Sequence, residues 1–326
     1  MTDPYANLAL EEYLLNCCAG DEKIILYFWQ NEDTVVIGRN QNAYTECNID
    51  YVAANGIHVA RRMTGGGAVF HDLGNLNYSL ILPLCLYHPG CAEKILVKSL
   101  NSLGIAASAN GRNDICLADG KISGNACYVG HKAVLCHGTL LYRADKAKMA
   151  SALNVAKSKL AKKGIVSVKS RVDDIASHYP TVTIADLMET IKKEVAAAYG
   201  LSEFLSLSVL EKEFAELREK YASYEWNWEK VKDYSLSLEK SFAWGTVRIS
   251  LSYAGEDLKD VEISSDALDA DFVEETKFAL RNEIFGTTGK LAVSFWDDFA
   301  LKRKDRRIAV NDIKDMVEEL SNKRKR

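Results

Sequence analysis

Three consecutive glycines constrain this chain more than any other feature of its sequence. Each glycine loses more backbone entropy on folding than any other residue, so a run of three is expected where the backbone turns tightly or lies close against another group. Two neighbouring arginines indicate that this group is an anion. A flexible surface turn with solvated arginines is the alternative. The stretch reads Arg61-Arg62-Met63-Thr64-Gly65-Gly66-Gly67-Ala68-Val69-Phe70-His71-Asp72.

The residues on both sides of the glycines favour β-structure. Ile57–Ala60 precede them and Ala68–Phe70 follow, and both runs are rich in β-branched, aromatic or small apolar residues. Such residues fit a pleated, half-buried surface. The stretch therefore predicts a strand, a turn and a second strand, and not a linker.

Length and composition indicate a soluble, two-domain protein. The chain has 326 residues, of which 48% are hydrophobic and 26% charged. Its net charge of −4, with no basic stripe between aromatic residues, argues against a dedicated nucleic-acid binder. The apolar run Tyr78–Tyr87 is too short to cross a membrane, and acidic residues stand where a signal peptide needs positive charge. We expect a cytoplasmic protein with neither a nucleic-acid nor a membrane partner.

The cysteines predict free thiols. All eight lie in the first half of the chain, none forms a CxxC pair, and several stand in apolar runs. These features are typical of reduced, half-buried cysteines in a cytoplasmic protein, without a disulfide framework.

The order of predicted elements favours an α+β fold with a mixed, largely antiparallel sheet and flanking helices. A helix begins at Pro4 and runs to about Cys18. The β-rich runs Lys23–Gln30 and Thr34–Gly38 predict a hairpin, because a polar turn separates them. The turn Asp119-Gly120 predicts another hairpin, whose second strand begins at Lys121. Further strands are expected at 75–82, 113–117 and 132–142, and helices at 48–55, 91–103, 184–199 and 208–221.

The character of the chain changes near residue 240. Strands are expected at 246–253 and 260–264, and helices at 271–283 and 311–322. This segment has no histidine, no cysteine and no glycine-rich anion loop. We therefore expect a catalytic domain over residues 1–239 and a small α+β accessory domain over residues 240–326.

Several common active-site motifs are absent from the sequence. The glycines are not followed by the Lys-Ser/Thr of a P-loop, no GxGxxG opens a helix, and neither zinc spacing nor GxSxG occurs. What remains is a set of cations and hydrogen-bond donors. Singly, each is more often structural or solvated, but together they suit binding of an anion and stabilisation of charge at phosphorus. The set comprises Arg61, Arg62, the glycine amides, His71, Lys121, Ser123 and His137.

A series of motifs resembles the signatures of lipoate–protein ligases. The resemblance extends from the first helix to at least residue 172, and the C-terminal segment resembles the accessory domain of full-length ligases. Thr64 stands where serine is more usual, and Cys127-Tyr128 follow the lysine motif where an arginine often stands. The matching motifs are the glycine stretch, Asn7–Glu12, Gly111-Arg112-Asn113-Asp114, Lys121–Ala126, His137-Gly138-Thr139 and Ser170-Arg171-Val172.

This resemblance implies a biotin/lipoyl ligase-like catalytic domain and a reaction in two steps. Lipoate and Mg-ATP give lipoyl-AMP and pyrophosphate, and a lysine of an acceptor protein then attacks the mixed anhydride. The implied cofactors are ATP and Mg²⁺, and the reaction serves salvage of free lipoate. The implied acceptors are lipoyl domains of 2-oxoacid dehydrogenase E2 subunits or the glycine-cleavage H protein.

The resemblance also implies a role for each motif residue. Lys121 is the expected catalytic residue, with its ammonium between the lipoate carboxyl and the α-phosphate. Asp114 is expected to hold Mg²⁺ or to orient Lys121. Val69, Tyr78 and Leu135 are expected to form a slot for the lipoyl chain. The residues expected to bind ATP and lipoyl-AMP are Arg62, Thr64, Gly65, Gly66, Gly67, Ala68, Val69, Phe70, His71, Asp114, Lys121, Ser123 and His137.

Three alternatives remain open at this point. The first is a transferase of the same fold that carries octanoyl or lipoyl groups as a thioester on Cys127 or Cys136. The second is a biotin ligase, and the third a non-catalytic binder of lipoyl domains. The sequence leaves open the acceptor, the preference for lipoate or octanoate, the oligomeric state, and any closure of the accessory domain over the adenylate.

Overall fold

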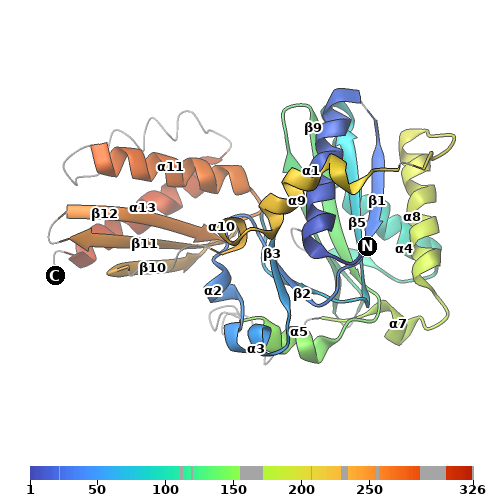
Figure 1. The fold of residues 1–326 in the computed structure, drawn as a ribbon, viewed down its shortest axis with the longest axis horizontal. Helices are drawn as coiled ribbons and strands as arrows, with labels where there is room; N and C mark the ends of the chain where they lie inside the picture. The colour runs from blue at the N-terminus through green and yellow to red at the C-terminus, as the bar shows by residue number, and fades with distance from the viewer. Residues whose placement is uncertain are drawn as a thin grey trace. The chain divides into compact units, whose positions relative to one another are not determined.

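A computed structural model describes residues 1–21, 23–110, 113–118, 120–154, 172–206, 208–228, 234–254, 257–286 and 306–324 (Figure 1). The chain divides into two compact units. The first comprises Met1–Ile37, Ala43–Met63 and Ala68–Glu229, and the second comprises Gly38–Asn42, Thr64–Gly67 and Lys230–Arg326. The sequence did not predict that two short early segments, one of them the glycine turn, would group with the C-terminal unit.

The first unit is built on a six-stranded sheet whose neighbouring strands all pair antiparallel. β5 (Asn75–Pro83) and β9 (Ala133–Leu141), which are neighbours within the sheet, are its most deeply buried strands. The fold class predicted from the sequence is thereby confirmed. In spatial order the strands are β1 (Ile25–Trp29), β5 (Asn75–Pro83), β9 (Ala133–Leu141), β8 (Lys121–Val129), β7 (Asp114–Cys116) and β6 (Ser108–Asn110).

Helices cover both faces of this sheet (Figure 1). One face carries the alternate residues Leu76, Tyr78 and Leu80 of β5 and packs in the main core with α4 (Cys91–Ser102) and α8 (Ile184–Tyr199). The opposite face packs against α1 (Pro4–Asp21). The helix α8 begins and ends as predicted, because Thr183 and Asp186 form a capping box and Gly200 adopts a left-handed conformation.

A second, three-stranded sheet holds the strands that flank the glycine turn. These are β3 (His58–Arg61) and β4 (Val69–His71), and β2 (Thr34–Ile37) lies between them. Both predicted strands are present, but they pair with β2 and not with each other: β3 runs parallel to it and β4 antiparallel. Three short helices accompany this sheet: α2 (Ala43–Glu46), α3 (Ile49–Ala54) and α5 (Lys146–Ala152).

The predicted hairpin of residues 23–30 with 34–38 is wrong. β1 pairs with β5, whereas β2 joins the small sheet. The reason lies in the polar segment between them, which is not a free turn. Asn31 is fully buried and bonds Asn7 and His71, and the Asp33 carbonyl accepts the amide of His58. All four residues of β2 are buried and need neighbours on both sides.

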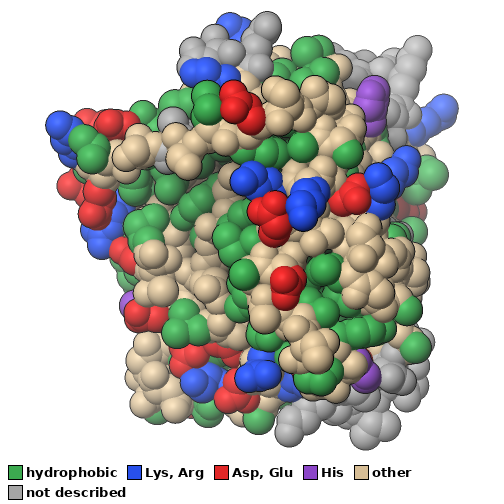
Figure 2. Space-filling model, turned by 90° about the vertical axis from the view of Figure 1, so that its right-hand side faces the viewer, with side chains coloured by type: hydrophobic (Ala, Val, Ile, Leu, Met, Phe, Trp, Pro, Cys, Tyr) green, Lys and Arg blue, Asp and Glu red, His purple; other side chains and the backbone are tan. Residues whose placement is uncertain are grey.

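The remaining described helices of the first unit are short. They are α7 (Ile175–His178), α9 (Ala215–Ala222) and α10 (Tyr224–Asn227), with 3₁₀ turns at Leu84–Leu86 and Glu211–Glu213. The helix predicted at 208–221 is therefore shorter than expected. On the face of the molecule shown in Figure 2, basic and acidic side chains are interspersed.

The C-terminal unit has a three-stranded antiparallel sheet in the order β10 (Leu236–Ser241), β11 (Thr246–Ala254) and β12 (Asp257–Ser265). Its helices are α11 (Ala270–Gly286) and α13 (Arg307–Arg324), and a single apolar core joins sheet and helices. The strands and helices expected here are present, and β10 was not predicted. Across the described residues, no helix combines the length and the apolar character needed to cross a membrane.

Two cysteines differ from the prediction of free thiols. Cys127 and Cys136 occupy directly opposed positions of β8 and β9 and form a disulfide, with 4.2 Å between their Cα atoms. Opposed residues of an antiparallel pair bring their Cβ atoms close, and only the strand register reveals this. The free thiols among the described residues are Cys17, Cys18, Cys47, Cys85, Cys91 and Cys116.

Candidate active site

A band of polar residues crosses the face of the central sheet that α1 covers. Alternate residues of a strand share a face, so Asn75, Asn77 and Ser79 of β5 point to the same side. Asn77 pairs with Thr139 of β9, and Ser79 pairs with His137. All of these except Thr139 are buried. Buried polar groups need hydrogen-bond partners, so such a band marks either a structural network or a binding site.

Glu11 of α1 organises one end of the band. Its carboxylate, 1% exposed, accepts the Ser79 hydroxyl at 2.5 Å and lies 2.9 Å from Nδ1 of His137. Ser79 Oγ in turn accepts the indole N–H of Trp29 at 2.8 Å. A buried network with every member paired rigidifies its surroundings. Glu11 therefore fixes the ring of His137.

His71, at the end of β4, is held as a neutral imidazole. Burial, with the charges of Arg62 and His137, lowers the pKa of His71 to about 3. Asn7 donates to Oδ1 of Asn31, which turns Nδ2 of Asn31 toward Nδ1 of His71 at 3.1 Å. Nδ1 must then accept, so the ring proton is assigned to Nε2.

Arg62 is a buried cation beside these groups. Its guanidinium donates to the Val36 carbonyl at 3.1 Å. Burial lowers the pKa of Arg62 to about 10, with Glu11 opposing and Arg61 adding to this effect. Arg62 therefore remains charged at neutral pH. The charge is suited to an anionic ligand in a water-poor site.

Three buried polar atoms of this region have no hydrogen-bond partner in the described structure. They are Nε2 of His71, Oδ1 of Asn75 and Nδ2 of Asn77. The other atoms of the two amides bond each other, Asn75 Nδ2 to Asn77 Oδ1 at 2.9 Å. An unpaired buried polar group costs about 1–3 kcal/mol. These three atoms, two donors and one acceptor, are therefore suited to bonding a polar ligand or water.

Lys121 and Asp114 form an ion pair on the same face of the sheet. The Lys121 ammonium lies 2.7 Å from Asp114 Oδ1, and both side chains are about one-third exposed (32% and 29%). A bulge between Ile115 and Cys116 shifts the register, so that Lys121 pairs with Cys116 and its side chain reaches the side of Asp114. The predicted hairpin that begins its second strand at Lys121 is confirmed, although Asp119 of its turn lies outside the described residues.

Gly124 leaves room for this ion pair. It pairs with Asp114, and a Cβ at Gly124 would lie 2.8 Å from the Lys121 nitrogen. Its amide donates to the hydroxyl of Thr139 at 3.2 Å. Because Thr139 pairs with Asn77, the Lys121–Asp114 pair and the polar band share one face of the sheet.

Other predicted residues point to the opposite face. Ser123 is buried, and its hydroxyl lies 3.5 Å from Oδ1 of Asn125, which also accepts the hydroxyl of Tyr78 at 2.5 Å. The prediction that Val69, Tyr78 and Leu135 together form a slot for the lipoyl chain is wrong. Tyr78 belongs to the core beneath α4 and α8, whereas Leu135 belongs to a separate core on the α1 side.

The glycine turn makes the close approach expected of it, but to protein backbone. Gly66 has φ +93°, and its amide donates to the Ala267 carbonyl of the C-terminal unit at 3.0 Å. A Cβ at Gly65 would lie 2.2 Å from the same oxygen. Thr64 and Gly67 belong to the same segment, whereas Ala68–Phe70 return to the first unit. The role of this turn in nucleotide binding remains a prediction.

Several residues were missed or lie outside the described part of the chain. Glu11 stands in a motif that was recognised, but no role was assigned to it. Asn75, Asn77 and Ser79 alternate with apolar residues, a sequence signal for one polar face of a buried strand. The motif residues Gly111, Arg112, Ser170 and Arg171 are outside the described residues.

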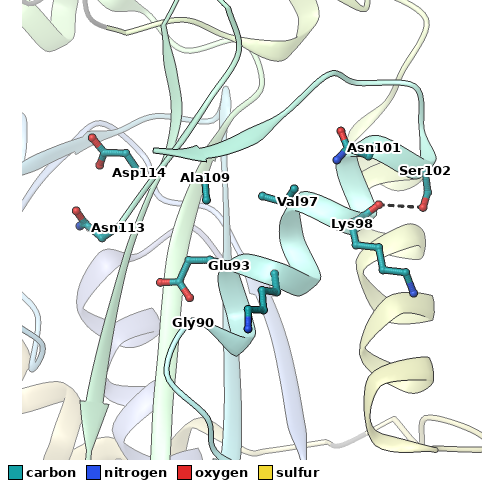
Figure 3. Close-up of a pocket in the computed structure, with 10 residues that line it drawn as sticks. Gly90, Glu93, Val97, Lys98, Asn101, Ser102, Ala109, Asn113 and Asp114 are labelled. Carbon is teal, nitrogen blue, oxygen red and sulfur yellow. Dashed lines mark hydrogen bonds between the residues drawn. The ribbon is translucent and has the colours of Figure 1, made fainter. Parts of the chain in front are cut away.

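A separate open cavity of about 700 Å³ lies between α4 and the β6–β7 hairpin (Figure 3). Asp114 borders it, but its carboxylate points away from α4 (Figure 3). This cavity is therefore distinct from the face that carries Lys121. The described residues contain no group of three or more His, Cys, Asp or Glu side chains that could hold a metal ion.

Comparison with known proteins gives one family. Residues 3–196 match the family model of the lipoyl protein ligase A/B catalytic domain. The chain is 40% identical over 249 residues to the probable lipoate-protein ligase A of Mycoplasma pneumoniae, covering 73% of this chain and 72% of that protein.

Solved structures agree with this result. P. falciparum LipL1 in complex with lipoate has a TM-score of 0.74 at 26% identity, covering 85% of this chain and 86% of LipL1. A bi-partite lipoate protein ligase of Thermoplasma acidophilum, from a structural analysis of that ligase and its E2 lipoyl domain, has a TM-score of 0.62 at 28% identity, covering 72% and 95%. A lipoate-protein ligase A bound with ATP has a TM-score of 0.59 at 27% identity, covering 69% and 94%. The chain therefore belongs to the lipoyl protein ligase A/B catalytic domain family.

Proposed function

We propose that this protein is an ATP-dependent lipoate–protein ligase. The observation that carries the proposal is the shared sheet face, on which unpartnered amide atoms of Asn75 and Asn77 accompany the Lys121–Asp114 pair. Nε2 of His71, on β4 of the smaller sheet, is unpartnered as well. Relatives solved with lipoate or with ATP, and a lipoate protein ligase described together with its E2 lipoyl domain, support the same activity. We assign catalysis to residues 1–239 and an accessory role to residues 240–326.

In the first step a carboxylate oxygen of lipoate attacks the α-phosphorus of ATP, and pyrophosphate leaves. The two reactants are both anions, so their approach requires a cation between them. The ammonium of Lys121 holds both and stabilises the charge that develops at phosphorus. The neutral ring of His71 donates a hydrogen bond through Nε2 to the activated carboxyl-phosphate and adds no charge to the site.

In the second step the uncharged amine of an acceptor lysine attacks the carbonyl carbon of lipoyl-AMP. An amide forms, AMP leaves, and the amine loses a proton. Lys121 stabilises the AMP leaving group. Burial of the mixed anhydride protects it from water. Arg62, Thr64, the glycine turn and Ala68–Phe70 complete the nucleotide site in this proposal, together with Ser123 and His137.

Mg²⁺ belongs to this proposal as the partner of ATP. Magnesium is commonly held by one or two carboxylates together with the substrate phosphates, so a single carboxylate such as Asp114 fits. A bound Mg²⁺ neutralises phosphate charge. Asp114 also orients Lys121 through the ion pair at 2.7 Å.

The proposed acceptors are lipoyl domains of E2 subunits and the glycine-cleavage H protein, the two acceptors that the sequence resemblance implies. The site of action proposed for this reaction is the cytoplasm. Purified protein is incubated with Mg-ATP, lipoate and each apo-acceptor, and pyrophosphate and intact acceptor mass are measured. We expect pyrophosphate release with lipoate, and one lipoyl group per acceptor. Absence of both contradicts the proposal.

One observation weighs against the thioester transferase. Cys136 is 1% exposed and is joined to Cys127 in a disulfide, so neither sulfur is a thiolate nucleophile in this structure. Retention of activity after thiol alkylation is expected. The variant Lys121→Ala separates a ligase from a non-catalytic binder, because a ligase loses about 10²–10³-fold in adenylation rate while a binder retains its partner affinity.

A further inference from the structure

The segment Val172–Asp174 lies against the backbone of Lys121. The amide of Asp173 donates to the Lys121 carbonyl at 2.8 Å, and Val172 forms an isolated parallel bridge with Lys121. On the other side, Lys121 pairs with Cys116. The pairing of β8 with β9 begins only at Asn125. The start of β8 therefore depends on this segment for support on one side.

The segment is itself held by buried charges. Asp173 and Asp174 are 7% and 5% exposed, and they share the ammonium of Lys146 at 3.2 and 2.7 Å. His178 Nε2 lies 2.8 Å from the second oxygen of Asp173. Asp174 also accepts the amide and the hydroxyl of Ser177, at 2.9 and 2.8 Å. One ammonium thus forms ion pairs with two adjacent buried carboxylates.

Both carboxylates remain ionised at neutral pH. Burial raises the pKa of Asp173, but the Asp174 amide, Lys146 and His178 oppose this effect and bring the pKa below its usual value. Burial also raises the pKa of Asp174, but Lys146 and Ser177 outweigh this effect, so the pKa of Asp174 is lowered too. Lys146 is consequently the main cation that balances them.

The helix that carries Lys146 also connects to the other end of the site. Asp145 caps α5 through the amides of Ala147 and Lys148, and the amide of Asp145 donates to Asp72 Oδ2 at 2.7 Å. Asp72 directly follows His71. One short helix thus links the His71 strand to the segment behind Lys121.

We propose that Lys146 is a positioning residue for Lys121. By holding Asp173 and Asp174, it keeps the Asp173 amide on the Lys121 carbonyl and fixes where the ammonium of Lys121 stands. The inference rests on the proposed role of Lys121 in adenylation. Loss of the Lys146 charge leaves two buried carboxylates without their ammonium, and the segment is expected to separate from β8. A displacement of the order of 1 Å at a reacting group lowers rates by up to about 100-fold.

The chain offers a matched control for this inference. Lys148 lies on the same helix, is 33% exposed against 28% for Lys146, and forms a 2.6 Å ion pair with Asp33. Amide hydrogen exchange of the peptide Lys121–Ala126 is compared in Lys146→Met, Lys148→Met and the unmodified protein. We expect exchange about 10-fold faster in Lys146→Met only. Unchanged exchange in Lys146→Met overturns the inference, whatever the activity.

Kinetics of adenylation provide the second measurement. In Lys146→Met we expect kcat to fall about 10-fold, with the KM values for ATP and lipoate within about twofold. Lys146→Arg should restore most of the rate, because a guanidinium bonds both carboxylates. A rise in KM with unchanged kcat overturns the positioning role.

Failure of the proposed ligase function and failure of the Lys146 inference give different results. If the unmodified protein makes no lipoyl-AMP, the ligase assignment is wrong, yet the exchange comparison still reports whether Lys146 holds the Lys121 strand. Should Lys146→Met not fold, His178→Ala removes one partner of Asp173 and should raise exchange at Lys121–Ala126 by a smaller factor. No increase in that variant also overturns the inference.

Discussion

At the scale of single residues, His71 couples the stability of the fold to pH. Its pKa is lowered from 6.5 to about 3 by burial and by neighbouring charges. Between these values the unfolded chain binds the proton more readily than the native protein, so stability falls as pH falls below 6.5. From pH 6.5 to pH 5 the loss amounts to about 2 kcal/mol.

The variant His71→Gln tests this expectation. It removes the titrating ring while keeping a polar side chain of similar length. Urea denaturation at pH 7.5, 6 and 5 measures the unfolding free energy. In the variant this free energy should fall less steeply as the pH is lowered, and the difference in slope should correspond to nearly one bound proton. Identical slopes in the two proteins would show that His71 does not carry the effect.

Gly124 tests the placement of the Lys121 ammonium. The variant Gly124→Ala adds a methyl group 2.8 Å from the Lys121 nitrogen, at the flexible end of a side chain that can move away. We therefore expect little change in unfolding free energy, and a fall of about 10-fold or more in adenylation rate. Pyrophosphate release and urea denaturation measure the two effects. An unaltered rate would mean that the lysine does not act from this position.

At the scale of elements, the sequence predicted strands and helices better than their partners. The helix α8 was predicted to the residue because its caps are local signals. The pairing of β1 and β2 was not, since the buried side chain of Asn31 redirects the chain through contacts with residues distant in sequence. The same limit applies to the site: Lys121 and His71 stand in recognisable motifs, whereas the Cys127–Cys136 pair and the Asp173–Lys121 bond depend on register.

A close approach within the central sheet gives a further test at this scale. A Cβ at Gly138 would lie 2.3 Å from Oδ1 of Asn125 and 2.8 Å from a ring carbon of Tyr78. Both neighbours are buried and fixed by a mutual hydrogen bond. Gly138→Ala should therefore lower the unfolding free energy by about 1–3 kcal/mol. Gly130→Ala, in the same β8–β9 hairpin, has its nearest contact at 3.0 Å and should cost less; equal losses contradict this account.

At the scale of the whole molecule, the glycine turn forms part of the C-terminal unit. The anion-binding role expected of this turn stays a prediction, whereas its structural role is visible, because the Gly66 amide donates to the Ala267 carbonyl. Asn40 of the other early segment acts similarly: its carbonyl accepts the amide of Ser265 at 2.8 Å, and its side chain donates to the Ala270 carbonyl at 2.7 Å. The second unit is therefore completed by residues far away in sequence.

Two alanine variants of the turn separate this structural role from simple loss of a glycine. In Gly65→Ala the new Cβ would lie 2.2 and 2.6 Å from the carbonyl oxygens of Ala267 and Leu268. These are backbone atoms, which cannot move aside as easily as the end of a flexible side chain. At Gly67, nothing lies within 4 Å of an added Cβ. We expect Gly65→Ala to release the turn from the C-terminal unit and to destabilise that unit by about 1–3 kcal/mol, with faster cleavage in limited proteolysis. Gly67→Ala should resemble the unmodified protein in this assay, since proteolysis reports stability and not nucleotide binding. Equal cleavage rates in the two variants would contradict the assignment of the turn to the C-terminal unit.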